Sequence, residues 1–84
     1  MFIELRNGNL INLDLVKTIY GEKDEEDNEP YHLNFLFGEN ELVTLTYHSE
    51  EKMLLAKRNL KKFILEDKKL INYLELLGDY NAKS

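Results

Sequence analysis

Two histidines, His32 and His48, carry the one side-chain type whose ordinary pKa lies near neutrality. Catalysis or metal binding through either one would need a carboxylate, a thiol or a second imidazole held against it. The alternation of residues 31–37 places His32 on the outer face of an expected strand, and His48 stands at the junction between a strand and a helix. We therefore expect both to be structural or simply exposed, and we predict no enzyme activity, no metal site and no cofactor.

An acidic run occupies residues 22–29, which contain six acids, one base and no apolar residue. Its candidates for a partner-binding role are Asp24, Glu25, Glu26, Asp27 and Glu29. Calcium loops space their ligands alternately and need a glycine at the turn, and this run has neither feature. The run is therefore interpreted as a solvated loop. Its carboxylates could also occupy a basic groove of another protein, where phosphates normally bind.

A basic stripe is expected on one side of a C-terminal helix. It consists of Lys57, Arg58, Lys61 and Lys62, and Lys68 and Lys69 extend it. Such a stripe could contact phosphates. However, the whole chain has a net charge of −5, and no aromatic side chain for base stacking is interleaved with these bases. The stripe is therefore predicted to be the solvated face of a helix, without direct binding of nucleic acid.

Charge is divided by position along the 84 residues. Residues 1–51 hold twelve acids and three bases, a net of −9, and residues 52–84 hold eight bases and four acids, a net of +4. With 43% apolar residues the chain can form a core, and the absence of cysteine excludes disulfides and thiolate metal sites. No basic N-terminal region leads into an apolar stretch, and no apolar run is long enough to span a membrane. We expect one cytoplasmic domain with no membrane contact.

Hydrophobic alternation predicts a β-rich first half. The expected strands cover residues 2–5, 10–11, 16–20, 31–37 and 41–47. Asn7-Gly8 predicts a type I′ turn in the first hairpin, and Asn12 is expected to cap a single helical turn. In the strongest strand, Phe35 belongs to the inner face.

Helical spacing predicts the second half. Ser49 with two acids behind it is typical of a helix start, and Asp67 is expected to cap a second helix that ends at Gly78. One long bent helix is the alternative, because no glycine or proline separates the two stretches. The expected domain therefore comprises a meander over residues 1–47, a helical part over 49–77 and a frayed tail over 79–84. No internal repeat is expected.

Surplus apolar residues indicate a contact surface. Leu36 and Leu42 fall on the outer face of the sheet, and the expected helices carry more leucines than one inner stripe can hold. We predict either a homodimer or a groove for a foreign partner at these positions.

Residues 5–19 (Leu-Arg-Asn-Gly-Asn-Leu-Ile-Asn-Leu-Asp-Leu-Val-Lys-Thr-Ile) resemble the opening of several groups of short bacterial and phage proteins. One is a small flagellar-operon protein family. Others are phage and mobile-element proteins in which a helix start like residues 47–51 (Tyr-His-Ser-Glu-Glu) follows the last strand. The chain is also similar in type to small phage inhibitors, including anti-CRISPR proteins, which are short, acidic, cysteine-poor and non-catalytic. The resemblance implies a β-meander with a packed helix.

The expected fold is α+β, a five-stranded antiparallel meander with one or two C-terminal helices over one face. The leading functional hypothesis is a non-enzymatic, phage-type inhibitor that covers the basic surface of a nucleic-acid-processing host protein with its acidic half. The alternative is a structural or regulatory bacterial homo-oligomer.

Overall fold

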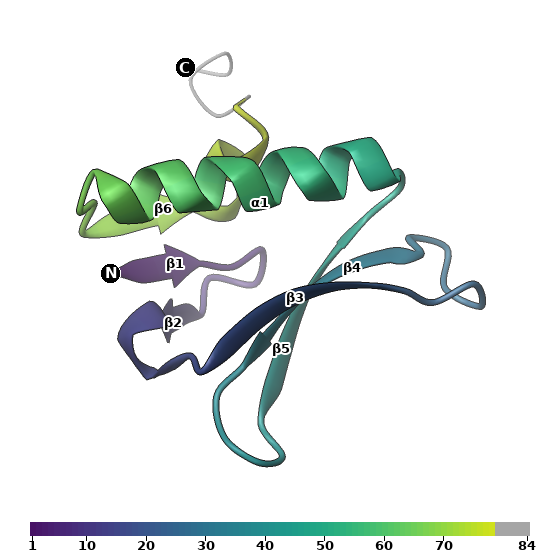
Figure 1. The fold of residues 1–84 in the computed structure, drawn as a ribbon, viewed down its shortest axis with the longest axis horizontal. Helices are drawn as coiled ribbons and strands as arrows, with labels where there is room; N and C mark the ends of the chain where they lie inside the picture. The colour runs from purple at the N-terminus through teal and green to yellow at the C-terminus, as the bar shows by residue number, and fades with distance from the viewer. Residues whose placement is uncertain (79–84) are drawn as a thin grey trace. The chain divides into compact units, whose positions relative to one another are not determined.

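The computed structural model of the protein describes residues 1–78, which form six strands, one α-helix and two 3-10 helices. In chain order the elements are β1 (Phe2–Glu4), β2 (Leu10–Asn12), η1 (Leu13–Leu15), β3 (Thr18–Lys23), β4 (Tyr31–Leu36), β5 (Leu42–Tyr47), α1 (Glu50–Leu65), β6 (Leu70–Asn72) and η2 (Tyr73–Leu77) (Figure 1). The expected α+β class is confirmed. The chain divides into two compact units. Unit 1 comprises Met1–Asp14 and the chain from Leu55 onward, and unit 2 comprises Leu15–Leu54. The single domain expected from the length stays a prediction.

Unit 1 contains a three-stranded sheet with the order β2-β1-β6. β2 pairs with β1 in the antiparallel direction and β6 pairs with it in the parallel direction. The register aligns Ile11, Ile3 and Ile71 in one row, and all of them are buried. Both outer strands have the sequence Leu-Ile-Asn, a short repeat that the sequence analysis did not anticipate.

The first hairpin turns differently from the expected type I′ turn. Gly8 has a φ of 87°, and no positive φ occurs at Asn7. The main chain of Gly8 donates to Leu5 (2.9 Å), and Leu5 donates to Asn9 (2.8 Å). The loop therefore has three residues and ends in a left-handed glycine. It is one residue longer than the two-residue loop of a type I′ turn. The expected single helical turn after Asn12 is confirmed as η1.

The helix α1 begins where the sequence predicts and connects the two units. The Ser49 side chain accepts from the main-chain nitrogen of Lys52 (3.2 Å), and Glu50 and Glu51 lie in the first turn. In unit 1, α1 is joined to η2, because Asn59 Nδ2 donates to the Leu76 carbonyl oxygen (2.7 Å). None of the helices in residues 1–78 has the length and apolar character needed to cross a bilayer.

The expected second helix is only partly present, because Asp67 ends α1 instead of starting a new helix. Asp67 has a left-handed φ of 55°, and its nitrogen donates to the Ile64 carbonyl (3.1 Å). The nitrogen of Lys68 donates to the Phe63 carbonyl (3.2 Å), which completes a Schellman motif. Residues 70–72 then form β6, and helical structure returns only in η2, which ends at the left-handed Gly78. The predicted frayed tail lies outside the described residues.

The left-handed conformation makes Asp67 a sensitive position for stability. Asp67→Gly should raise the free energy of unfolding by about 0.5–1 kcal/mol, and Asp67→Val should lower it by about 1–2 kcal/mol, because a Cβ is disfavoured at this φ and most of all when branched. Asp67→Asn serves as the control and should change little. Urea denaturation measures all three, and a stabilising valine would contradict the assigned role of Asp67.

Unit 2 contains an antiparallel meander with the order β3-β4-β5. Leu33 and Phe35, both on the predicted inner face of β4, are fully buried. Gly21 of β3 is their neighbour on this face, and a Cβ built there would lie 2.9 Å from Met53 Sδ. The glycine therefore leaves the space in which the buried Met53 side chain approaches the sheet. The acidic connection is shorter than expected, since Glu22 and Lys23 belong to β3.

Phe35 should dominate the stability of unit 2. Phe35→Ala is expected to lower the free energy of unfolding by about 3–5 kcal/mol, since a buried ring leaves a cavity when it is truncated. Leu54→Ala is the control, because Leu54 is half exposed on α1 and its truncation should cost less than about 1 kcal/mol. Equal effects of the two substitutions would contradict the assigned inner face.

Candidate functional site

The candidate site is the connection between β3 and β4, residues 24–30, which we name the acidic loop. Its ends are joined by a main-chain hydrogen bond from the Asp24 nitrogen to the Pro30 carbonyl oxygen (2.7 Å), which continues the ladder between the two strands by one step. A second main-chain bond joins the Asp27 nitrogen to the Asp24 carbonyl oxygen (3.2 Å). These bonds give the loop a defined main-chain path despite its high charge.

Two aspartates shape the loop with their own side chains. Asp24 Oδ1 accepts from the main-chain nitrogen of Glu26 (3.1 Å), and Asp27 Oδ1 accepts from that of Glu29 (3.0 Å). Aspartate often closes such turns, because its short side chain reaches the main chain two residues further on. An acidic run can therefore be well ordered where its carboxylates accept from their own main chain.

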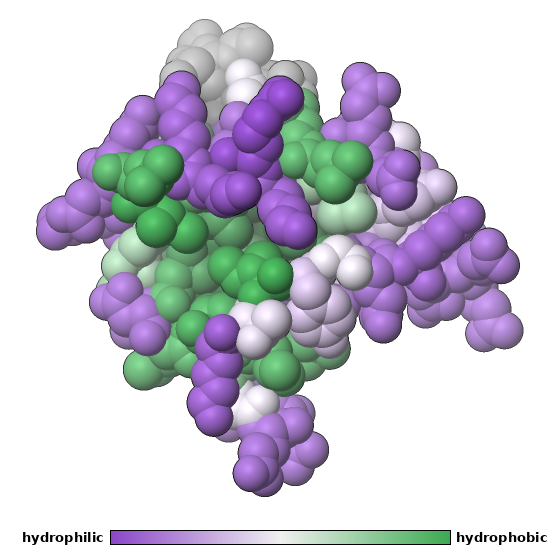
Figure 2. All heavy atoms as spheres, viewed as in Figure 1, coloured by the Kyte–Doolittle hydropathy of each residue, from purple (hydrophilic) through white to green (hydrophobic). Residues whose placement is uncertain are grey.

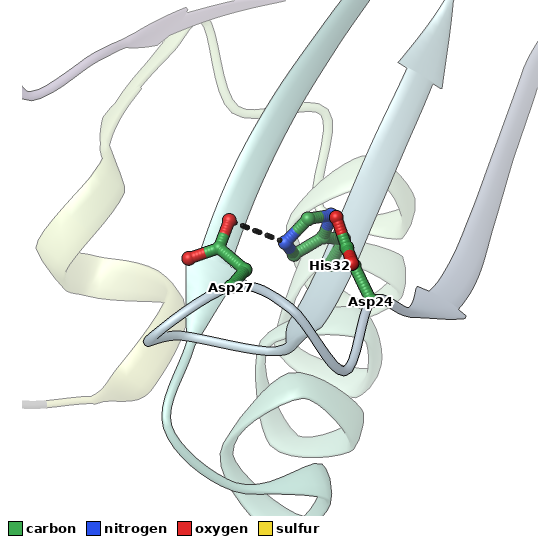
Figure 3. Close-up of side chains that lie close together, drawn as sticks. All are labelled: Asp24, Asp27 and His32. Carbon is green, nitrogen blue, oxygen red and sulfur yellow. Dashed lines mark hydrogen bonds and ion pairs between the residues drawn. The ribbon is translucent and has the colours of Figure 1, made fainter.

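Side chains of β4 and β5 hold the far half of the loop against the strands. His32 Nε2 lies 3.1 Å from Asp27 Oδ2 (Figure 3), and the imidazole nitrogen must be the donor because an ionised carboxylate only accepts. Thr46 Oγ1 donates to Glu29 Oε1 (2.9 Å). His48 Nε2 lies 3.4 Å from the other oxygen of the same carboxylate. Both histidines of the chain thus contact the acidic loop.

Hydrogen bonding lowers the pKa of Asp27 from its ordinary value of 3.8. The main cause is the hydrogen bond from the Glu29 main chain, and His32 and the Asn28 main chain add to it against an opposing desolvation effect. Next to the loop, Tyr31 and then Glu25 raise the pKa of Lys23. The Lys23 ammonium lies 5.4 Å from the centre of the Tyr31 ring and 3.5 Å from Glu25 Oε1. The charged forms of both residues are therefore favoured in the folded state.

Asp24, Asp27 and His32 are the group within residues 1–78 whose potential metal-ligand atoms come together, all within 4.8 Å of one another (Figure 3). Two carboxylates and an imidazole would suit a divalent cation. In the structure these side chains bond to the protein itself, through the two aspartate turns and the contact between His32 and Asp27. The arrangement is therefore explained as a support for the loop, and we derive no metal chemistry from it.

The predicted partner-binding residues fall into separate sets within unit 2. Asp24, Glu25 and Glu26 are exposed in the first half of the acidic loop. Asp27 and Glu29 are engaged with β4 and β5, and their side chains keep 40% and 27% of their exposure. Leu36 and Leu42 face each other across β4 and β5 at the opposite end of the ladder from the loop. Leu42 is 48% exposed, whereas Leu36 is half-buried.

A polar network on the outer face of this sheet was missed by the sequence analysis. Asn34 is only 1% exposed. Its Nδ2 donates to Glu22 Oε1 (3.3 Å), and its Oδ1 accepts from Thr44 Oγ1 (2.6 Å). These contacts cross β3, β4 and β5. Asn34 and Thr44 are direct cross-strand partners, whereas Glu22 lies diagonally, two residues along β3 from Tyr20, the partner of Asn34. The amide is satisfied on both sides, as a buried polar group requires.

The basic stripe belongs to α1 and the residues after it. Arg58, Lys61 and Lys62 are exposed, and Lys57 is half-buried. Lys68 lies 4.9 Å from the centre of the Phe63 ring, and Lys69 pairs with Asp67 (3.8 Å). The extension of the stripe therefore takes part in the turn that ends α1.

Comparison with known proteins gave no match, whether with family models, curated proteins or solved structures. The resemblance to phage inhibitors and to the flagellar-operon family therefore stays a prediction.

Asp27 should make stability depend on pH in the acid range. The pKa of Asp27 is lower in the folded than in the unfolded state. Its contribution to the free energy of unfolding is therefore fully present above the unfolded value near 3.8, and it is lost as the pH falls through the lower folded pKa. Asp27→Asn should therefore lower stability at pH 7 and flatten the stability profile below pH 4. Thermal unfolding between pH 2 and pH 7 measures this, with Glu26→Gln as the control. Parallel profiles for Asp27→Asn and the wild type would contradict the role of Asp27.

Proposed function

We propose that this protein is a non-enzymatic binding module whose acidic loop docks on a basic surface of another protein. The single observation that carries the proposal is that some acids of the loop contact the neighbouring strands while others are exposed. Asp27 and Glu29 hold it on the strands, while Asp24, Glu25 and Glu26 are exposed. In Figure 2, the end of unit 2 that carries the loop is almost entirely hydrophilic.

Preorganisation supports this reading. A flexible acidic tail must lose conformational entropy when it binds, whereas a loop closed by main-chain bonds and aspartate turns has already lost most of that freedom. Three exposed acids follow one another along this main chain, and the Asp24 carboxylate is held by the Glu26 nitrogen (3.1 Å). They can therefore match a cluster of lysines and arginines and raise the rate of encounter.

The partner class follows from this charge. Proteins that process nucleic acids carry basic grooves for phosphates, and fixed carboxylates can occupy such a groove. The proposed action is therefore that of a phage-type inhibitor, comparable with anti-CRISPR proteins, which blocks a nucleic-acid-processing host protein by covering its groove. The proposal treats the contacts of both histidines with Asp27 and Glu29 as supports of the acidic loop and assigns no reaction to them.

A structural or regulatory homo-oligomer is the second candidate. It is favoured by the apolar composition of β5, which forms one edge of its sheet and exposes Leu42.

Removing charge from the exposed half of the loop tests the proposal. The variant Asp24→Asn, Glu25→Gln, Glu26→Gln keeps the loop shape, because an asparagine oxygen at position 24 still accepts from Glu26. The matched control is Glu39→Gln, Glu41→Gln, Glu66→Gln, which removes the same charge from exposed positions outside the loop. Proteins captured from bacterial lysate are identified by mass spectrometry, and heparin serves as the competitor that fills basic grooves.

The captured protein is then purified and its binding rates are measured by surface plasmon resonance. The loop variant should associate roughly tenfold more slowly or worse at low salt, with a smaller change in dissociation, and the control should bind like the wild type. Added salt should weaken wild-type binding. Unchanged association by the loop variant would overturn the proposal. Loss of binding only in Lys57→Gln, Arg58→Gln, Lys61→Gln, Lys62→Gln would assign the working surface to the basic stripe.

A further inference from the structure

The two edges of the unit 2 sheet differ in a way that bears on self-association. The order β3-β4-β5 leaves β3 and β5 as the edge strands. β3 contains a glycine and two charged residues, Gly21, Glu22 and Lys23. The six residues of β5, Leu-Val-Thr-Leu-Thr-Tyr, include no charge, glycine or proline. Natural proteins use charges, prolines and bulges to keep edge strands from pairing with other chains, and β5 has none of these.

The register shows which main-chain groups of β5 point away from β4. The Phe37 nitrogen donates to the Glu41 carbonyl oxygen (2.9 Å), so these residues form a hydrogen-bonded pair. Such pairs alternate along an antiparallel ladder. Val43 and Leu45 therefore bond to β4, whereas the N–H and C=O groups of the residues between them point outward. The bond from the Lys17 nitrogen to the Leu36 carbonyl oxygen (2.7 Å) agrees with this alternation, because Leu36 must then face β3.

The outward groups of β5 belong to Leu42, Thr44 and Thr46. Within residues 1–78, no main-chain hydrogen bond to these groups is present on the side away from β4. Their regular spacing on an extended strand makes them a template for one more antiparallel strand.

We propose that β5 is a dimer interface, at which the β5 strands of two copies of this chain pair in the antiparallel direction about a two-fold axis at Thr44. Thr44 then faces Thr44 of the second copy, and Leu42 faces Thr46 of the second copy. In this register, the residues whose N–H and C=O groups point away from β4 lie opposite one another. Each outward N–H group therefore meets an outward C=O group of the second copy. Moving the axis to Leu42 or Thr46 would leave part of each strand without an opposing strand.

The side chains agree with this register. Thr44 meets its own copy, and threonine pairs are favourable across strands. On the other face Val43 lies opposite Leu45 of the second copy, and both are half-buried in one copy. Glu41 lies opposite Tyr47, so no like charges face each other anywhere along β5. An isologous pair also closes on itself, because each copy contributes the same edge strand.

This inference extends the second candidate function and does not depend on the acidic loop. Substitutions on β5 should change the mass of the particle, whereas the loop substitutions should change only the binding of a basic partner. The two proposals can therefore fail separately.

Sedimentation equilibrium of the full chain is the first test. The wild type should be a dimer that dissociates on dilution. Thr44→Pro removes an outward N–H without breaking the ladder to β4, and it should weaken dimerisation roughly tenfold or more. Thr44→Ala is the matched control. Like proline, alanine removes the hydroxyl group that contacts Asn34, but it keeps the main-chain N–H, so this variant should remain a dimer. Circular dichroism checks that each variant is folded.

A second test addresses the register. Leu42→Glu with Thr46→Lys places opposite charges against each other at both ends of the pairing, and Leu42→Lys with Thr46→Lys places like charges there. The two variants share the change at Thr46 and differ only in the sign of the charge at position 42. The first should remain a dimer, with a dissociation constant that rises with salt. The second should be a monomer.

Hydrogen exchange followed by NMR is the direct readout. Above the dissociation constant, the amides of Leu42, Thr44 and Thr46 should be protected, and below it they should exchange fast. Those of Val43 and Leu45 should be protected in both conditions. A wild type that stays monomeric at the highest soluble concentration overturns the proposal. A dimer that forms equally in Thr44→Pro and in the like-charge variant also overturns it, since a different surface would then be responsible.

Discussion

The pairing of β1 on both of its edges is the constraint on which unit 1 depends. β1 has only three residues and cannot be stable as part of an isolated hairpin, yet its central Ile3 is fully buried. Burial of its main chain requires hydrogen bonds on both sides, and β2 and β6 supply them. β6 can reach β1 only if the chain leaves α1 and turns back. The left-handed Asp67 provides this turn, and the nitrogen of Phe2 then donates to the Lys69 carbonyl oxygen (2.9 Å).

The two strands beside β1, β2 and β6, have the same sequence and end in the same way. In each Leu-Ile-Asn strand the isoleucine is buried in the row with Ile3. In each strand, the asparagine side-chain oxygen accepts a hydrogen bond from the main-chain nitrogen two residues later. Asn12 accepts from Asp14 and Asn72 accepts from Leu74, both at 3.0 Å. Asn72 also donates to Glu4 of β1 (3.1 Å), and Glu75 completes its capping box. The repeat is therefore a structural device: a short strand followed by a capped 3-10 turn.

In unit 2 the central strand β4 connects the core to the candidate site. Its inner side chains, Leu33 and Phe35, are fully buried. Its outer side chains include Asn34, which joins the strands, and His32, which holds Asp27 of the acidic loop. The position of the loop thus follows from the register of the sheet, because a slip by one residue would turn His32 to the opposite face. The proposed partner-binding surface and the proposed dimer edge belong to the same sheet but use different groups, side-chain carboxylates in the first case and main-chain amides and carbonyls in the second.

Sequence alone determined those elements whose local residue pattern is compatible with one type of secondary structure. Alternation identified β4, β5 and the buried place of Phe35, Ser49 with its acids marked the start of α1, and the acidic run marked a loop. Local pattern failed at Leu70–Asn72, because short apolar runs fit a helix or a strand equally well, and the available edge of β1 decided between them. It also failed for His32 and Asn34, which alternation places on an outer face. The His32 side chain is only 12% exposed beside Asp27 of the acidic loop, and Asn34 is 1% exposed between Glu22 of β3 and Thr44 of β5. Those contacts arise only when the strands are in register, and for this reason the tertiary structure decided which carboxylates of the acidic loop are engaged and which are exposed.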